Sequence, residues 1–409
     1  MDAKLLEVVF TICFCALAYH YAGYPVLLFF LAQLSQMKSD FLYLLHRASR
    51  RSRNSGDCVP RVAVLVSAYN EEAVIEAKVR NSMALDYPSD RIEFLFGLDA
   101  PADSTAEILG RARSNQVRVM PFEARRGKLA VLCDLAQNTD AEILVLTDAN
   151  TMLNQDCIRN LVRHFADPRV GAVSGEEVRV AAAATDPGAE SLYWRYESAL
   201  KVLESRLNCS MGGNGAALAV RHSLFHPRPK SIVEDFQVPL DLRFNGYRVI
   251  YDPEAVATEE IAPTFSAQFE RRVRIAAGNY QTLFRNPAYL NPLTGRFAFA
   301  FLSHRLLRWL APVFLPLVFF CSLALVPRAL FSMLAAAQSV FYLMAVLGYR
   351  RRKQTQQARW LSLPLHFCSM NLALLFGLFR YLRGRQALTW KATPRVARGM
   401  LLDNSAGDQ

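Results

Sequence analysis

Residues 142–151 read EILVLTDANT, and this stretch most constrains how the chain can fold. Its apolar run, Ile143 to Leu146, has no polar interruption, which is typical of a strand buried on both faces of a parallel sheet. The polar residues that follow place Asp148 and Asn150 at the carboxyl edge of that sheet, where open α/β sheets bind ligands. A carboxylate and an amide two residues apart can both reach one hard cation, although a strand that ends in a simple turn has the same pattern.

Strand-like and helix-like segments alternate through the soluble part of the chain. Apolar runs begin at Val62, Ile92 and Val117, and a segment with helical spacing follows each of them, the third at residues 128–137. Residues 170–174 and 248–252 are expected as further strands. This alternation predicts βαβ units and therefore an α/β fold with a Rossmann-like, mostly parallel sheet. Polar residues also follow the first two strands, at Ser67 to Glu71 and at Asp99, and we expect them to meet Asp148 at one edge.

Four apolar segments lie outside this soluble domain, and each is long enough to form a membrane helix or half of a helical hairpin. Aromatic and basic residues at helical spacing precede the second of them, which predicts helices lying on the membrane surface. The expected division is a transmembrane helix at residues 1–36, a basic linker at 37–60, the soluble domain at 61–262, interfacial helices at 263–309, a transmembrane hairpin at 310–349, a basic loop at 350–359, a fourth apolar segment at 360–382 and a basic tail at 383–409.

Basic residues outnumber acidic ones, 47 to 36, which gives a net charge of +11. Because the excess lies beside the apolar segments, it fits an anionic membrane surface and the positive-inside rule, and it argues against nucleic acid as a partner. We therefore expect a multi-pass protein of the cell (inner) membrane whose soluble domain lies in the cytoplasm. Both flanks of residues 360–382 are basic, so the charge rule leaves open whether that segment spans the bilayer or is re-entrant.

Seven short motifs follow one another in a specific order along the chain. They are SAYNE at residues 67–71, the strand-end Asp99, Gly127-Lys128, DAN at 148–150, GNG at 213–215, VED at 233–235, and Gln268 followed by Arg271 and Arg272. This order resembles the membrane-bound family-two glycosyltransferases, the group that includes the cellulose, hyaluronan and chitin synthases. The resemblance covers roughly residues 61–285 and implies an A-type glycosyltransferase domain combined with transmembrane α-helices.

The resemblance implies a binding site for a nucleotide sugar. Its residues would be Ala68, Tyr69, Glu71, Asp99, Lys128, Asp148, Ala149 and Asn150. Asp148 and Asn150 stand where the family has its Asp-x-Asp motif, which binds Mg²⁺ or Mn²⁺ on the diphosphate of the donor. Asn in place of the second Asp keeps an oxygen ligand but removes a charge, so a weaker affinity for the metal would follow.

The resemblance also implies an acceptor site at Gly213, Asn214, Gly215 and Glu234, with Asp235 as the catalytic base. Gln268, Arg271 and Arg272 resemble the Gln-x-x-Arg-Trp signature of processive synthases, near the diphosphate. Arg272 replaces the final Trp of that signature, which puts processive synthesis in question. A simpler interpretation of Glu234 and Asp235 is a helix start whose carboxylates offset the helix dipole.

Sugar transfer needs these side chains because the departing diphosphate gains negative charge and the acceptor hydroxyl loses a proton. The sequence therefore predicts an inverting membrane glycosyltransferase with a nucleotide-sugar donor, expected to be a UDP-sugar, and a polysaccharide or lipid-linked acceptor in surface polysaccharide synthesis. Mg²⁺ or Mn²⁺ is the expected cofactor, and membrane lipid is an expected partner. Two alternatives stay open: a single-transfer enzyme acting on a polyprenyl-linked acceptor, and a non-catalytic membrane subunit that binds nucleotide sugars. Export or accessory subunits are not identified by the sequence.

Overall fold

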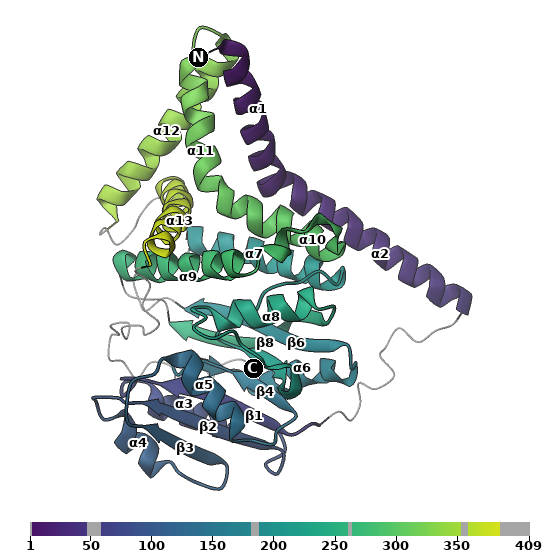
Figure 1. Ribbon diagram of the computed structural model, residues 1–409, viewed down its shortest axis with the longest axis vertical. Helices are drawn as coiled ribbons and strands as arrows, with labels where there is room; N and C mark the ends of the chain where they lie inside the picture. Colours follow the sequence, from purple (N-terminus) through teal and green to yellow (C-terminus); the bar gives the residue numbers. More distant parts are fainter. Residues whose placement is uncertain (1, 47–58, 181–187, 261–263, 353–358, 385–409) are drawn as a thin grey trace, which may run out of the picture.

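The computed structural model describes residues 2–46, 59–180, 188–260, 264–352 and 359–384 of the 409-residue chain. Half of the predicted basic linker and most of the predicted basic loop and basic tail lie outside these described residues. Figure 1 shows a sheet domain below and a group of long helices above it, with two helices, α7 (Gly188–Arg206) and α9 (Phe265–Arg285), lying between them.

One eight-stranded sheet forms the centre of the domain, in the order β3-β2-β1-β4-β7-β6-β8-β5. The strands are β1 (Val62–Ala68), β2 (Ile92–Asp99), β3 (Val117–Phe122), β4 (Ile143–Leu146), β5 (Thr151–Leu153), β6 (Val170–Val180), β7 (Leu218–Arg221) and β8 (Arg248–Glu260). The first four are parallel to one another, β6 is parallel to β8, and only β5 and β7 run antiparallel to their neighbours. The predicted mostly parallel α/β sheet is therefore confirmed.

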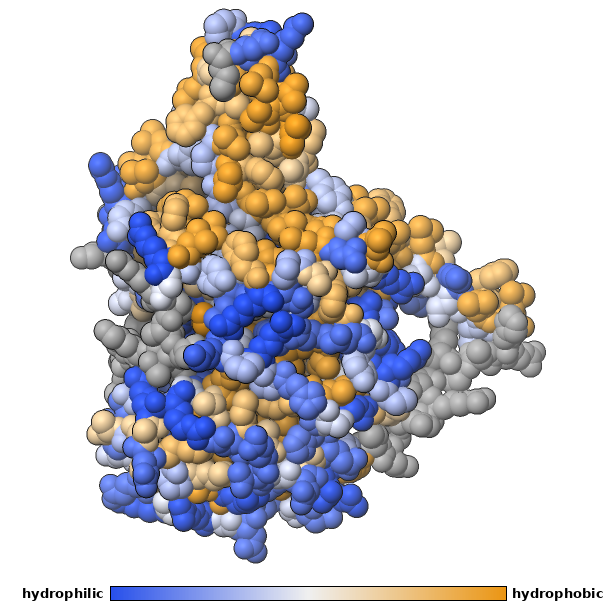
Figure 2. All heavy atoms as spheres, in the orientation of Figure 1, coloured by the Kyte–Doolittle hydropathy of each residue, from blue (hydrophilic) through white to orange (hydrophobic). Residues whose placement is uncertain are grey.

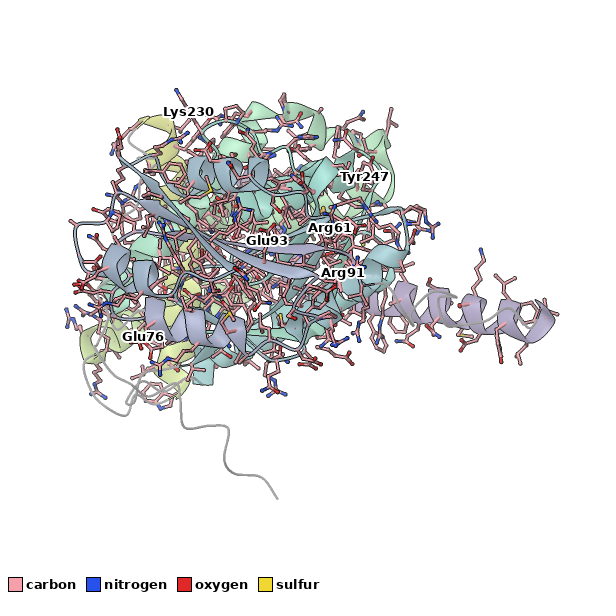
Figure 3. All side chains as sticks on the ribbon, turned by 90° about the horizontal axis from the view of Figure 1, so that it is seen from below. Arg61, Glu76, Arg91, Glu93, Lys230 and Tyr247 are labelled. Carbon is pink, nitrogen blue, oxygen red and sulfur yellow. The ribbon has the colours of Figure 1, made fainter. Side chains whose placement is uncertain are left out.

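Helices cover both faces of this sheet, which explains why β1 and β4 are buried along their whole length. One face packs against α3 (Ile75–Met83), α4 (Thr105–Arg111) and α6 (Cys157–Val162), and the other against α5 (Lys128–Gln137) and α8 (Glu234–Phe244). Arg61 and Arg91, which precede β1 and β2, lie side by side in Figure 3, in agreement with the 2.8 Å hydrogen bond from the Val62 amide to the Arg91 carbonyl. The opposite, carboxyl ends of these strands therefore form one common edge.

Within the described part of the chain, four helices are long and apolar enough to cross a membrane. They are Ala3–Leu45, which joins α1 (Ala3–Ala18) and α2 (Tyr24–His46) through a π-helical turn; Arg296–Ala324, which joins α10 (Arg296–Ala300) and α11 (Leu307–Ala324); α12 (Ala329–Arg351); and Trp360–Leu382 of α13 (Arg359–Leu382). Large apolar side chains such as Ile12, Phe320 and Met333 point outward from them. Figure 2 shows this as a hydrophobic upper part above a hydrophilic sheet domain.

The predicted interfacial helix around residues 297–309 is not a separate element. It continues without a break into the next apolar segment, through a π-helical turn at Phe301–Leu306, and Pro312 and Pro316 lie inside α11 without ending it. The amphipathic helix of this region is α9, which packs along α13. At their crossing, a Cβ added to Gly377 would lie 2.4 Å from the Ala276 Cβ, so the two backbones approach closely.

Candidate active site

A cavity of about 1680 Å³ lies between the carboxyl edge of the sheet and α9. The predicted site residues that line it are Glu71, Lys128, Asp148, Ala149, Asn150, Gly213, Asn214, Gly215, Glu234, Asp235, Gln268, Arg271 and Arg272. Residues from widely separated stretches of the sequence therefore meet in one space. Ala68 and Asp99 are fully buried beside this cavity, and Tyr69 lies under the Arg125 guanidinium at 3.6 Å from the ring centroid.

Lys128 joins two of the predicted carboxylates. Its ammonium lies 2.8 Å from Oδ1 of Asp148 and 2.9 Å from Oε1 of Glu234, and its side chain is only 19% exposed. Burial lowers the pKa of Lys128, but Asp148, Glu234 and Asp235 raise it more strongly, so the pKa ends well above its usual value. Lys128 is therefore a permanent cation at the floor of the cavity.

Gly215 marks the point at which three of the predicted site residues converge. A Cβ placed on this glycine would lie 3.0 Å from Oδ2 of Asp148, 3.2 Å from Nζ of Lys128 and 3.4 Å from Oδ2 of Asp235. Gly213 is equally constrained, because a Cβ there would lie 2.5 Å from the backbone oxygen of Asp235. The two glycines of the GNG motif thus leave room for Asp148, Lys128 and Asp235.

Asp235 has the environment of a proton acceptor. Burial raises the pKa of its carboxyl, Glu234 raises it further and Lys128 lowers it, which leaves the pKa at about 6, against 3.8 for an unperturbed Asp. A carboxylate with a pKa near the working pH is still ionised at neutral pH and binds a proton more readily than an ordinary Asp. Its Oδ1 also accepts a 3.0 Å hydrogen bond from the Phe236 amide at the start of α8.

Two predicted ligand-binding residues hold loops in place. Asp99 accepts hydrogen bonds from the amides of Arg126 (2.6 Å) and Gly127 (3.0 Å), and so it fixes the turn that presents Lys128. Asn214 donates to the Gly175 carbonyl (2.8 Å) and accepts from the Ala217 amide (3.0 Å). Their direct contacts with the donor and the acceptor stay predictions.

Asn150 and Arg271 meet at a residue that the sequence patterns did not reveal, Glu259 on β8. Asn150 Nδ2 donates to Oε1 of Glu259 at 2.9 Å, and the two terminal nitrogens of Arg271 donate to the two Glu259 oxygens at 2.8 Å each. Burial raises the pKa of Glu259, but Arg271 lowers it more, so Glu259 is ionised. Arg272 on the same helix donates to the Ser369 hydroxyl of α13 at 3.2 Å.

The donor set near Asp148 fits a divalent cation that is bound together with a phosphate ligand. The Asp148 side chain is 30% exposed to the cavity, and the amide of Asn150 turns its nitrogen toward Glu259. Among the described residues, no group of three or more His, Cys, Asp or Glu side chains could enclose a metal ion. Mg²⁺ and Mn²⁺ sites with one or two protein ligands and phosphate oxygens have this character.

Lys78 is a second buried group that the sequence did not reveal. Its ammonium is fully buried and donates to the Thr147 hydroxyl at 3.0 Å and to the Thr151 carbonyl at 2.6 Å, one on each side of the Asp148–Asn150 loop. Burial lowers its pKa to about 7 although Asp148 raises it. A lone lysine on the apolar face of α3 was the only signal in the sequence.

Comparison with known proteins finds two family matches, which overlap and together cover residues 63–390. Residues 143–390 match the family described as Glycosyl transferase family group 2, and residues 63–221 match Glycosyl transferase family 2. The chain is 30% identical over 236 residues to a beta-monoglucosyldiacylglycerol synthase of Synechocystis sp., covering 54% of this chain and 48% of that protein. It is 25% identical over 236 residues to a poly-beta-1,6-N-acetyl-D-glucosamine synthase of Staphylococcus aureus, covering 55% and 56%.

The chain therefore spans about half the length of the curated relatives it matches. A solved mannosyltransferase from Pyrobaculum calidifontis, in complex with GDP-Man and Mn²⁺, has a similar fold, with a TM-score of 0.66 and 23% identity over 92% of this chain and 99% of that one. This likeness extends over the sheet domain and the helices together.

Proposed function

The chain belongs to glycosyl transferase family group 2 and is a glycosyltransferase, and we propose that it moves a sugar, with inversion, from a UDP-sugar to a hydroxyl group of a membrane-associated acceptor. The observation that carries this proposal is the convergence of Asp148, Lys128 and Asp235 beside Gly215. A cation, a metal-binding carboxylate and a proton acceptor are the groups that such a transfer requires.

Asp235 acts as the base in this proposal. Its carboxylate accepts the proton of the acceptor hydroxyl while that oxygen attacks the anomeric carbon and the bond to the diphosphate breaks. Since one displacement occurs without an enzyme nucleophile, the anomeric configuration inverts. Glu234 pairs with Lys128 at 2.9 Å and, through its charge, raises the pKa of Asp235.

The negative charge of the departing diphosphate is stabilised by cations of the chain. Lys128 lies next to Asp148, and Arg274 of α9 also lines the cavity. Mg²⁺ or Mn²⁺, held by Asp148 and Asn150 when bound, would neutralise further charge on the diphosphate oxygens. The mannosyltransferase with a similar fold was solved with Mn²⁺ and a nucleotide sugar, which supports this assignment.

The acceptor enters from the membrane side. Part of the cavity wall comes from helices that are long and apolar enough to span a membrane, and Trp309, Leu374, Phe376 and Arg305 all line it. Apolar side chains next to a cationic one suit an amphiphilic, lipid-linked acceptor. The two curated relatives are named as a glycolipid synthase and a polysaccharide synthase, and both product classes are compatible with such an entrance.

One observation favours single transfer onto a lipid-linked acceptor over processive synthesis. Arg272, at the position of the signature Trp, donates its hydrogen bond to Ser369 and so binds α9 to α13. The position of the signature Trp is thus occupied here by a residue that makes a contact between helices.

The proposed location of the sheet domain is the cytoplasm, on the inner face of the cell membrane. Support comes from the basic residues beside the apolar segments, since Arg350 and Arg351 end α12 at its domain-facing end. Arg328 pairs with Glu7 at the far end of the helices, away from the sheet domain.

The test is product analysis with the full chain in lipid nanodiscs. UDP- and GDP-sugars are offered with Mn²⁺ or Mg²⁺ and with lipid-linked or free saccharide acceptors, and the products are identified by mass spectrometry. Asp235→Asn should reduce transfer by about 10² to 10⁴ with little change in donor affinity. Glu270→Gln removes a charge from the same cavity at a side chain that is 63% exposed, so it serves as the control. Near-normal turnover by a folded Asp235→Asn protein would remove Asp235 from the mechanism.

A further inference from the structure

We propose that Glu259 and Arg271 position Asn150 so that its amide presents oxygen to the metal, and that this pair requires Asn at position 150 where related enzymes have a second Asp. The inference rests on the proposed function, because it assumes that Asp148 and Asn150 hold a cation with the donor. It assigns Arg271 a positioning role that acts through Glu259.

The hydrogen bond between Asn150 and Glu259 fixes which way the amide turns. An ionised carboxylate only accepts hydrogen bonds, so the group facing Oε1 of Glu259 at 2.9 Å must be the amide nitrogen. The amide oxygen, on the same carbon, is then directed away from Glu259. Since Asn150 lines the cavity, this oxygen is the atom available to a cation.

The backbone brings Glu259 to this position. β5 begins at Thr151, directly after Asn150, and pairs antiparallel with β8 in a register that sets Thr151 opposite Glu259. The Glu259 side chain is 6% exposed, so water competes little for its oxygens. Asn150 and Glu259 are thus neighbours because of strand pairing, although 109 residues separate them in the sequence.

Arg271 holds the Glu259 carboxylate in a fixed plane. Both of its terminal nitrogens donate at 2.8 Å, one to each oxygen, which is the bidentate geometry that arginine makes with carboxylates. Glu259 therefore stays ionised, so it has no proton to donate to Asn150, and its carboxylate plane is fixed. An Asp at position 150 would place a second carboxylate against Glu259, and the like charges would repel.

The affinity for Mn²⁺ tests this arrangement and requires no enzymatic turnover. The full chain in detergent is titrated with Mn²⁺ in the presence of UDP and, separately, of GDP, and free Mn²⁺ is followed by electron paramagnetic resonance. Residues that orient metal ligands typically contribute about 10- to 100-fold to affinity, so Glu259→Gln should weaken Mn²⁺ binding about tenfold. With Asn150→Asp present, Glu259→Gln should not weaken binding, because the introduced glutamine amide can donate to the new carboxylate.

Thermal melting without metal supplies the second readout. The melting temperature of Asn150→Asp should be lower than that of the wild type. The melting temperature of the double variant Asn150→Asp/Glu259→Gln should be higher than that of Asn150→Asp. Glu254→Gln is the matched control: Glu254 lies on the same strand, β8, its side chain is 67% exposed and pairs with Arg163, so the variant removes a charge from β8 but leaves the acceptor of Asn150 in place. Should Glu259→Gln fail to fold, Arg271→Lys, which keeps the charge but loses the bidentate geometry, should weaken Mn²⁺ binding in the same direction.

An equal loss of Mn²⁺ affinity from Glu259→Gln with Asn or with Asp at position 150 would overturn the proposal, since Glu259 would then act by charge alone. Unchanged Mn²⁺ binding in both Glu259→Gln and Arg271→Lys would overturn it as well. Asp148→Ala separates this failure from failure of the proposed function: if Asp148→Ala leaves nucleotide-dependent Mn²⁺ binding intact, the metal site itself is wrong, whatever Glu259 does.

Discussion

Replacing Lys128 by Met should move the acid limb of the pH–rate profile to higher pH. Asp235 must be ionised to accept a proton, so the wild-type kcat/KM should fall as the pH falls through about 6, the pKa of this carboxyl. The Lys128 ammonium and Oδ2 of Asp235 lie 3.2 Å and 3.4 Å from the same point beside Gly215. At most about 7 Å therefore separates the two charges, and at an effective dielectric constant of about 20 their attraction is at least about 2.4 kcal/mol.

That attraction corresponds to about 1.7 pKa units, since one unit equals about 1.36 kcal/mol. Without the ammonium, Glu234, Asp148 and Glu177 still raise the proton affinity of Asp235, so the limb should appear between about pH 7 and 8. The assay is kcat/KM for donor turnover from pH 5 to 9, with a thermal melt at each pH to confirm that the protein is folded.

Lys201→Met is the matched control for this shift. Lys201 lines the same cavity, but its ammonium lies over the Tyr251 ring at 5.1 Å from the centroid, so its loss should leave the limb near pH 6. An unmoved limb in a folded Lys128→Met protein would show that the titrating group does not sense Lys128, and it would refute the assignment of that limb to Asp235.

Three further predictions concern the glycine loop, the buried lysine and the membrane topology. Gly215→Ala should lower kcat/KM by about 10²-fold without loss of stability, because its methyl group would enter the space between the catalytic groups; Gly110→Ala, whose Cβ would meet no atom within 4 Å, should leave kcat/KM unchanged. Lys78→Met should lower the free energy of unfolding by about 1–3 kcal/mol for each acceptor left unpaired, and chemical denaturation with a wild-type midpoint would contradict this. A cysteine introduced at Asn115 should react with a membrane-impermeant maleimide only in inverted vesicles, and labelling in intact cells would place the sheet domain outside the cytoplasm.

The sequence predicted the parallel half of the sheet well because each strand there is a continuous apolar run. Residues 143–146 and 128–137 were expected as a strand and a helix, and the structure has β4 and α5 with those bounds. β5 and β7 were missed because strands of three and four residues show no measurable periodicity. β6 and β8 were predicted too short, since their second halves are rich in charged residues such as Glu176, Glu177 and Glu259.

The candidate site also contains residues that the sequence predicted and residues that it did not. Asp148, Lys128 and Asp235 were predicted from short motifs, and the structure brings them together because strand ends and helix starts share one edge. Glu259 and Lys78 were missed because their partners lie far away in the sequence. Lys78 hydrogen-bonds residues 69 and 73 positions further along, so only the fold shows that its charge is satisfied.

The membrane helices take part in building the site as well as in anchoring the protein. α9 forms one wall of the cavity, and the contacts that hold it against α13 include the close approach at Gly377, the hydrogen bond from Arg272 to Ser369 and the ring contact of Phe269 with Phe376. Arg271 lies on this same helix, between Glu270 and Arg272, and its guanidinium holds Glu259 beside Asn150. A displacement of α13 would therefore shift α9, the Glu259 carboxylate and the amide proposed to bind the metal in turn. In the proposed function an acceptor enters the cavity from the lipid and passes this wall, so α9 takes part in both acceptor entry and donor binding.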